Sequence, residues 1–166
     1  MKILHLNRSD VGGGAARAVY RVHHALRNIN VDSTMYVNHA GTTDWTVISP
    51  QKKSEKLLIR VRQEIANQFS KIFKSANKIT HSSAIFGSNL VGMLNRSDYD
   101  IIHLHWVQGE MLSIKEIGKI KKPVIWSFHD MWPFCGCEHY AYNLRYSEGY
   151  KDNNRSQNEF KFFDIN

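Results

Sequence analysis

Short apolar runs separated by amphipathic segments organise most of the chain. Continuous apolar runs predict buried strands at Ile3–Leu6, Thr34–Val37, Asp100–His105 and Pro123–Phe128, and a shorter run predicts another strand at Trp45–Ile48. Strands that are apolar on both faces are typical of a parallel sheet that is covered on both sides.

Apolar residues at helical spacing predict helices between these strands. The predicted helices cover Ala15–Asn28, roughly Ser54–Ser75, a short segment within 80–98, and Ser113–Ile120. In the last of these, Ser113 is the expected N-cap and Glu116 occupies the N3 position of a capping box. Because strands alternate with helices, the sequence predicts an α/β fold with a Rossmann-like, doubly wound parallel sheet.

The composition is that of a globular protein, with 42% of the 166 residues hydrophobic and 22% charged. No apolar run approaches the roughly 20 residues of a membrane span. The N-terminal sequence MKILHLN lacks the apolar core and cleavage site of a signal peptide. We therefore expect a cytoplasmic protein.

The net charge is +7, and basic residues cluster within residues 52–78. Such a stretch favours an anionic partner, either nucleic acid or a lipid surface. We do not expect nucleic acid binding, because the chain has no zinc-finger spacing, RNP motif or clear helix-turn-helix.

The helix predicted in this basic stretch has an apolar face made of Leu57, Leu58, Val61, Ile65, Phe69, Ile72 and Phe73. Two interpretations follow. The helix could rest on anionic lipid at the inner face of the cell membrane, or it could be a core helix whose basic face is solvated. We favour the core helix.

Three consecutive glycines, Gly12, Gly13 and Gly14, lie between the first strand and its helix. In a doubly wound sheet this is the edge where ligands bind, and backbone N–H groups without side chains can approach an anion closely. A tight turn with positive φ would explain one or two glycines, whereas three favour a phosphate-binding turn. The following sequence AAR fits neither a P-loop nor the dinucleotide-binding fingerprint.

The segment FHDMWPFCGCEHY, residues 128–140, follows the last strand and reaches the same edge of the sheet. His129 and Asp130 lie where a strand delivers side chains into a cleft, so His129 could contact a substrate hydroxyl or take part in proton transfer. Alternatively, Trp132 and Phe134 plug the end of the sheet and His129 is a structural histidine. The sequence of this segment favours neither interpretation over the other.

His103 and His105 alternate along one strand and therefore point to the same face. A metal site could use this pair together with Cys135 and Cys137. No further ligand stands at a recognisable spacing, so we favour buried, hydrogen-bonded histidines and expect no metal.

Three segments, MKILHLNRSDVGGGAARAVYRVHHAL, DIIHLHW and KKPVIWSFHDMWPFCGCEHY, resemble the N-terminal domain of family 4 glycosyltransferases. The likeness is to the bacterial branch that acts in colanic-acid, capsule or O-antigen synthesis, and HDMWPF…GCxHY is its most specific block. The resemblance implies the N-terminal half of a GT-B fold over residues 1–146, followed by a polar tail over 147–166. It also implies retaining transfer of a sugar, of the hexosyltransferase type, from a nucleotide-sugar donor to a lipid-linked or other glycan acceptor. No cofactor or essential metal is implied.

The same resemblance assigns roles by position. It places the three glycines near the donor diphosphate and His129 beside the transferred sugar and the acceptor, with Asp130 as its neighbour in a catalytic motif. We add His105, Trp132 and His139 as candidate residues on the acceptor side.

The chain departs from the family pattern in its C-terminal part. Family members bind the donor mainly through a C-terminal domain with two glutamates eight positions apart, and no two glutamates of this sequence have that separation. We expect a truncated domain that is inactive without this C-terminal domain or a separate donor-binding subunit. The alternative is a non-catalytic remnant or a partner-binding subunit.

Overall fold

A five-stranded, all-parallel sheet forms the centre of the protein. The computed structural model describes residues 1–71, 79–141, 145–149 and 151. The strands are β1 (Lys2–Ser9), β2 (Asp32–His39), β3 (Val47–Ile48), β4 (Ile101–Leu104) and β5 (Val124–Trp126). Their spatial order is β3-β2-β1-β4-β5, so the direction of winding reverses between β1 and β4. The predicted Rossmann-like α/β fold is confirmed.

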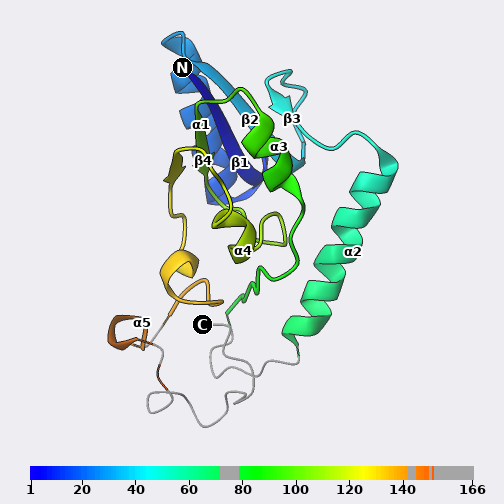
Figure 1. The fold of residues 1–166 in the computed structure, drawn as a ribbon, viewed down its shortest axis with the longest axis vertical. Helices are drawn as coiled ribbons and strands as arrows, with labels where there is room; N and C mark the ends of the chain where they lie inside the picture. The colour runs from blue at the N-terminus through cyan, green and yellow to red at the C-terminus, as the bar shows by residue number, and fades with distance from the viewer. Residues whose placement is uncertain (72–78, 142–144, 150, 152–166) are drawn as a thin grey trace.

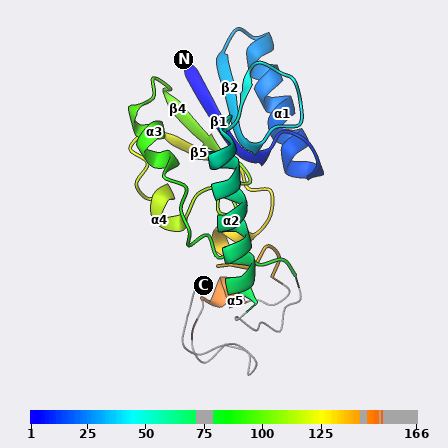
Figure 2. The same ribbon diagram turned by 90° about the vertical axis from the view of Figure 1, so that its right-hand side faces the viewer.

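Helices cover both faces of this sheet. α1 lies on one face and the short helices α3 and α4 lie on the other, as Figure 2 shows, while α2 runs along one side (Figure 1). The helices are α1 (Gly13–Asn28), α2 (Lys53–Ser70), α3 (Leu90–Arg96), α4 (Ile114–Ile117), the 3-10 turn η1 (Trp132–Phe134) and α5 (Arg145–Glu148).

The capping box expected for the fourth helix is present. The Ser113 hydroxyl accepts from the Glu116 amide, and the Glu116 carboxylate accepts from the Ser113 amide. The same carboxylate also accepts from the amides of Ser88 and Asn89, which join the segment before α3 to α4. α4 is shorter than predicted, since it ends at Ile117.

The two sheet faces differ in chemistry. The face under α3 and α4 is apolar and forms the larger core, made of Leu4, Leu6, Ile102 and Leu104 with Val91, Leu94, Val107, Met111 and Leu112. The face under α1 carries polar side chains, because the alternate residues of β1, β2 and the β4 segment include His5, Ser33 and His105. All three are buried.

The expectation that α2 is a core helix is wrong. Most of its predicted apolar face points away from the domain, with Leu57 62% and Ile65 51% exposed and with Leu58 and Val61 exposed beside them, whereas Phe69 is half-buried and packs against Phe86. The opposite side makes the contacts: Ile59 and Ala66 are buried, and Gln63 donates to the Gly109 carbonyl. The predicted members Ile72 and Phe73 lie outside the described residues.

The C-terminal part of the chain is described only in pieces. α5 (Arg145–Glu148) forms where the sequence predicted no element. Most of the predicted polar tail, 147–166, lies outside the described residues, so the domain boundary at 146 stays a prediction. Within the described ranges, no helix combines the length and apolar character needed to cross a bilayer.

Candidate functional site

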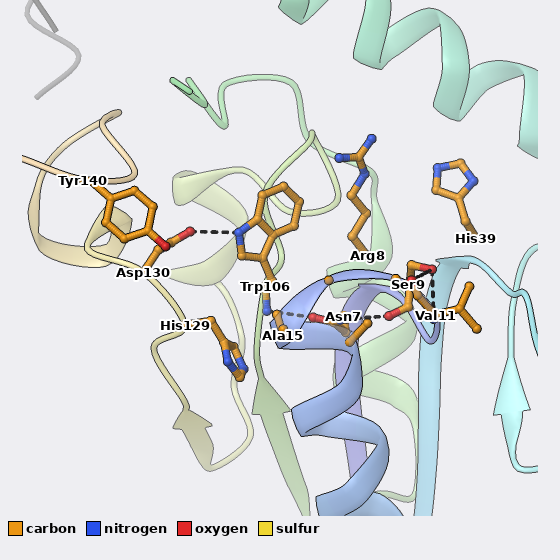
Figure 3. Close-up of a pocket in the computed structure, with 14 residues that line it drawn as sticks. Asn7, Arg8, Ser9, Val11, Ala15, His39, Trp106, His129, Asp130 and Tyr140 are labelled. Carbon is orange, nitrogen blue, oxygen red and sulfur yellow. Dashed lines mark hydrogen bonds between the residues drawn. The ribbon is translucent and has the colours of Figure 1, made fainter. Parts of the chain in front are cut away.

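A cavity of about 570 Å³ opens at the carboxyl ends of the strands, where the strand order reverses. Its lining joins the end of β1 and the glycine turn to Trp106 after β4 and to His129 and Asp130 after β5 (Figure 3). His39 at the end of β2 and Tyr140 complete the rim. The volume is that of a small-molecule site, and the place is where doubly wound sheets bind ligands.

The three glycines form the uncapped N-terminus of α1. Gly12 and Gly13 have φ of 75° and 74°, which explains two of the three glycines by backbone conformation. A Cβ at any of the three positions would meet no atom within 4 Å. No side chain in the described part of the protein caps the helix, and its first turn contains no acidic residue. The first amides of α1 therefore remain open to an anion in the cavity.

Asp10 fixes this turn from behind. Its buried carboxylate accepts from the amides of Gly41 (2.7 Å) and Thr42 (2.9 Å) and from the Thr42 hydroxyl. Burial opposes ionisation of Asp10, but these hydrogen bonds prevail and lower its pKa. Asp10 thus links the β1–α1 loop to the β2–β3 loop, and its negative charge is stabilised by amide and hydroxyl donors of the β2–β3 loop.

Arg8 is the cation of the cavity lining. Its guanidinium carbon lies 5.5 Å from the centroid of the Trp106 ring, and its amide donates to the Trp106 carbonyl (2.9 Å). Asn7 adds a second link, because its Oδ1 accepts from the Trp106 amide (2.9 Å). No carboxylate of the described residues forms an ion pair with Arg8. These hydrogen bonds therefore join the end of β1 to the segment after β4. The positive charge of the Arg8 guanidinium remains available to an anion in the cavity.

Asp130 lines the cavity, but its oxygens are occupied by protein donors. Oδ2 accepts from the Trp106 indole N–H (2.8 Å) and lies 2.6 Å from His139 Nδ1, and Oδ1 accepts from the Trp132 amide (3.1 Å). Burial alone would raise the pKa of Asp130; the hydrogen bond and charge of His139 and the Trp106 bond outweigh it and lower the pKa. Asp130 organises the loop 129–140, and its predicted catalytic role stays a prediction.

His129 lies at the cavity wall with one ring nitrogen bound inward. Its Nε2 is 3.0 Å from Nδ1 of His105, and the two rings stack. Burial lowers the pKa of His129, and the nearby Asp130 partly offsets this. His129 is therefore a neutral imidazole at neutral pH, held by one nitrogen.

The three residues predicted for the acceptor side do not line this cavity. His105, Trp132 and His139 are 2%, 3% and 4% exposed. The Trp132 indole N–H donates to the Ser82 carbonyl, and His139 Nε2 contacts the Ser82 hydroxyl. These residues lie in the protein interior next to the cavity lining, where they contact His129 and Asp130 and hold them in place.

The expectation of hydrogen-bonded histidines on the β4 segment agrees with the contacts. His103 Nε2 lies 2.8 Å from Ser127 Oγ, and both nitrogens of His105 contact other imidazoles. The nitrogens of His5, His103 and His105 lie within 4.8 Å of one another, which is close enough for a metal ligand set. Cys135 and Cys137 belong to no such cluster among the described residues.

Arg8, Asn7 and His39 are lining residues that sequence reasoning missed. Each follows an apolar run at the end of a strand, which is the positional signal that singled out His129. The pKa of His39 is lowered by burial and by the charge of Arg8. Their contribution depends on β1, β2 and β4 being neighbours, an order that no local pattern reveals.

The structure is a Rossmann-like domain in which a glycine turn, an arginine without an ion pair among the described residues, and a histidine line one cavity. The family model for Glycosyltransferase Family 4 matches residues 12–162. The chain belongs to this family, and a sugar donor and an acceptor are its general substrates. Curated proteins and solved structures gave no match.

Proposed function

We propose that this domain takes part in transfer of a sugar from a nucleotide-sugar donor to a glycan acceptor in cell-surface polysaccharide synthesis. The observation that supports this best is one cavity containing an anion-binding turn, Arg8 and His129. The first amides of α1 and the guanidinium would bind the donor diphosphate. His129 would face the transferred sugar and the acceptor hydroxyl.

The small number of these groups also limits the expected rate of sugar transfer. Stabilising a leaving nucleoside diphosphate needs several donors placed around it before reaction. One glycine turn and one arginine provide few, so transfer by these 166 residues alone should be very slow or absent. A C-terminal domain or a separate subunit would supply the remaining donor contacts.

Calorimetric titration with UDP and GDP tests the diphosphate site. Arg8→Gln should weaken binding about tenfold or more, the worth of a charge-assisted hydrogen bond of roughly 1.5–3 kcal/mol. Arg21→Gln, an exposed position on α1, is the matched control and should leave affinity unchanged. Equal affinities in the two variants would remove Arg8 from the site.

The histidine requires an assay of sugar transfer. The chain should be combined with its donor-binding partner or studied within a longer polypeptide that includes it. His129→Ala should then reduce transfer strongly with little change in diphosphate affinity, because the two contacts are separate. Unchanged transfer would show that His129 has no role in the reaction.

We further propose that α2 rests on an anionic lipid surface, where a lipid-linked acceptor would be found. Its exposed residues Leu57, Leu58, Val61 and Ile65 form a stripe at helical spacing, and exposed Lys53, Lys56 and Arg60 flank it. This combination favours the interface of an anionic bilayer, with about 1 kcal/mol from each cation near the surface.

Co-sedimentation with vesicles tests this surface. The chain should bind vesicles that contain phosphatidylglycerol, release at high salt, and bind pure phosphatidylcholine weakly. Leu57→Ser with Ile65→Ser should abolish binding, whereas Ile29→Ser, at the exposed C-cap of α1, should not. Equal binding by both variants would exclude α2 as the contact.

A further inference from the structure

A chain of hydrogen-bonded side chains crosses the sheet face beneath α1, from the cavity to the loop before β3. Each member contacts the next through one pair of nitrogen or oxygen atoms. In order from the cavity they are His129, His105, His5, Ser33, His23, Thr46 and Asp44. We call this set the histidine chain. Its members lie far apart in the sequence, so only the folded sheet joins them.

The half nearest the cavity consists of three imidazoles. Nε2 of His129 is 3.0 Å from Nδ1 of His105, and Nε2 of His105 is 3.1 Å from Nδ1 of His5. Nε2 of His5 then lies 3.1 Å from Ser33 Oγ. His5 and His105 face each other because β1 and β4 are adjacent parallel strands, with His5 opposite His103 in the register.

The far half ends at a carboxylate. Ser33 Oγ lies 2.7 Å from Nδ1 of His23, and Nε2 of His23 lies 2.7 Å from the Thr46 hydroxyl. The Thr46 hydroxyl donates to Asp44 Oδ1 (2.6 Å). Asp44 Oδ2 accepts from the Tyr20 hydroxyl (3.1 Å) and lies 3.0 Å from His24 Nε2.

The carboxylate fixes the direction of every bond in the chain. An ionised carboxylate only accepts, so Thr46 must donate to it and must accept from Nε2–H of His23. Neutral His23 then has a bare Nδ1, which accepts from the Ser33 hydroxyl. Ser33 has no second proton, so it accepts from Nε2–H of His5.

The same reasoning continues to the cavity. Nδ1 of His5 is bare and accepts from Nε2–H of His105, whose bare Nδ1 accepts from Nε2–H of His129. A neutral imidazole carries one N–H, so Nδ1 of His129 is left with its lone pair.

The protonation states support this assignment. Burial opposes ionisation of Asp44, but hydrogen bonds from the Thr46 side chain and amide and from Tyr20 lower its pKa to about 2. Burial, with smaller repulsion from neighbouring histidines, lowers the pKa of His5 to about 3 and that of His105 to about 2. Burial and the nearby His24 lower the pKa of His23 to about 4. At neutral pH the carboxylate is charged and the rings are neutral.

We propose that Asp44, acting through the histidine chain, holds His129 in the Nε2–H tautomer, so that His129 offers the substrate a hydrogen-bond acceptor at Nδ1. Asp44, Thr46, His23, Ser33, His5 and His105 are then positioning residues for His129. Use of the Nδ1 lone pair on a sugar or acceptor hydroxyl rests on the proposed function, whereas the tautomer does not. An experiment can therefore refute the tautomer and the use of the Nδ1 lone pair independently of each other.

Nuclear magnetic resonance tests the tautomer directly. In the full 166-residue chain labelled with ¹⁵N-histidine, long-range ¹H–¹⁵N spectra distinguish protonated from bare ring nitrogens. At neutral pH His23, His5, His105 and His129 should all show a protonated Nε2 and a bare Nδ1. A protonated Nδ1 on His129 would overturn the proposal.

A matched pair of variants tests the origin of the direction. Thr46→Val removes the hydroxyl with little change of shape, so the Nδ1–H tautomer should become populated along the chain as far as His129. Thr46→Ser keeps the hydroxyl and should preserve the wild-type spectrum. A merely structural threonine would not change the tautomer of a distant histidine, so an unchanged His129 spectrum in folded Thr46→Val would refute control by Asp44.

Two further measurements keep the proposal testable if Thr46→Val does not fold. Ser33→Ala breaks the chain in the middle, so His23 should keep its tautomer while His129 loses its preference. Metal analysis of the purified chain covers the competing use of the same nitrogens. One zinc per chain on His5, His103 and His105 would break the N–H···N bond between His5 and His105 and overturn the assignment.

Discussion

Mild acid should destabilise this protein well above the pH at which carboxylates are protonated. His5, His23 and His105 are buried, and burial is the main cause that lowers their pKa values from 6.5 to about 3, 4 and 2. In the unfolded chain these rings return to the ordinary value. Between these limits the unfolded state binds more protons than the folded state, so stability falls as pH falls.

The size of the effect follows from the three shifts. Each buried histidine stabilises the fold fully above pH 6.5, and below it loses about 1.4 kcal/mol per pH unit until the pH reaches its folded pKa. Three histidines together lose about 4 kcal/mol per unit, or about 6 kcal/mol between pH 7 and pH 5. A domain of this size has a total stability of about 5–15 kcal/mol, so a large share would be lost at pH 5.

Urea unfolding followed by circular dichroism between about pH 5 and pH 8 measures this slope. His23→Gln should reduce the slope below pH 6.5 by about 1.4 kcal/mol per pH unit, because one buried histidine no longer titrates. Val19→Ala, buried in the same helix, should lower the unfolding free energy at every pH and keep the slope. A flat profile, or a His23→Gln slope equal to that of wild type, would refute neutral burial of these rings.

Three further substitutions, two of them with a control substitution, test local features through the unfolding free energy. Gly12→Ala should cost about 1–3 kcal/mol because φ is 75° with ψ 141°, whereas Gly14→Ala, in ordinary helical backbone with open space around it, should be neutral or stabilising. Asp10→Ala should cost about 1–3 kcal/mol by leaving two amides of the neighbouring loop without their acceptor, and it should weaken UDP binding by releasing the glycine turn. Glu116→Ala should cost about 2 kcal/mol because it removes the capping box, while exposed Glu64→Ala should change stability by less than about 0.5 kcal/mol.

The sequence predicted the positions of the helices and strands better than the contacts that each of them makes. The apolar runs located all five strands, and the spacing of Ser113 and Glu116 predicted a capping box that is present. These features depend on local spacing, which the sequence contains directly. The ends of β1 and β2 were predicted too short because their polar terminal residues pair in the ladder but lack an apolar signal.

The orientation of α2 could not be predicted in the same way. Helical spacing identifies an apolar stripe but not what faces it. Here Gln63 and Arg62 donate to the carbonyls of Gly109 and Glu110, so the side of α2 that carries these residues together with buried Ile59 and Ala66 faces the domain. These contacts join residues more than 40 positions apart, beyond the reach of any local pattern.

In the candidate site, too, features set by local position were predicted, whereas contacts between distant segments were not. The glycine turn and His129 were predicted from their place after strands, and both line the cavity. The pairing of His5 with His105 depends on the adjacency of β1 and β4, which are 100 residues apart at this contact. Sequence reasoning therefore found His129 and the buried His105, but not the contacts by which buried residues orient His129.

Two separate networks hold the His129–Asp130 pair, and this determines which groups remain for chemistry. The histidine chain binds His129 through Nε2, while Trp106, His139 and the Trp132 amide occupy the oxygens of Asp130. A carboxylate that accepts three bonds and has a lowered pKa is a poor proton donor. Among the described residues, the first amides of α1, the Arg8 guanidinium and Nδ1 of His129 have no ion-pair or side-chain hydrogen-bond partner that would occupy them. Two donor groups beside one acceptor are what the proposed function requires, since it places a diphosphate next to an acceptor hydroxyl.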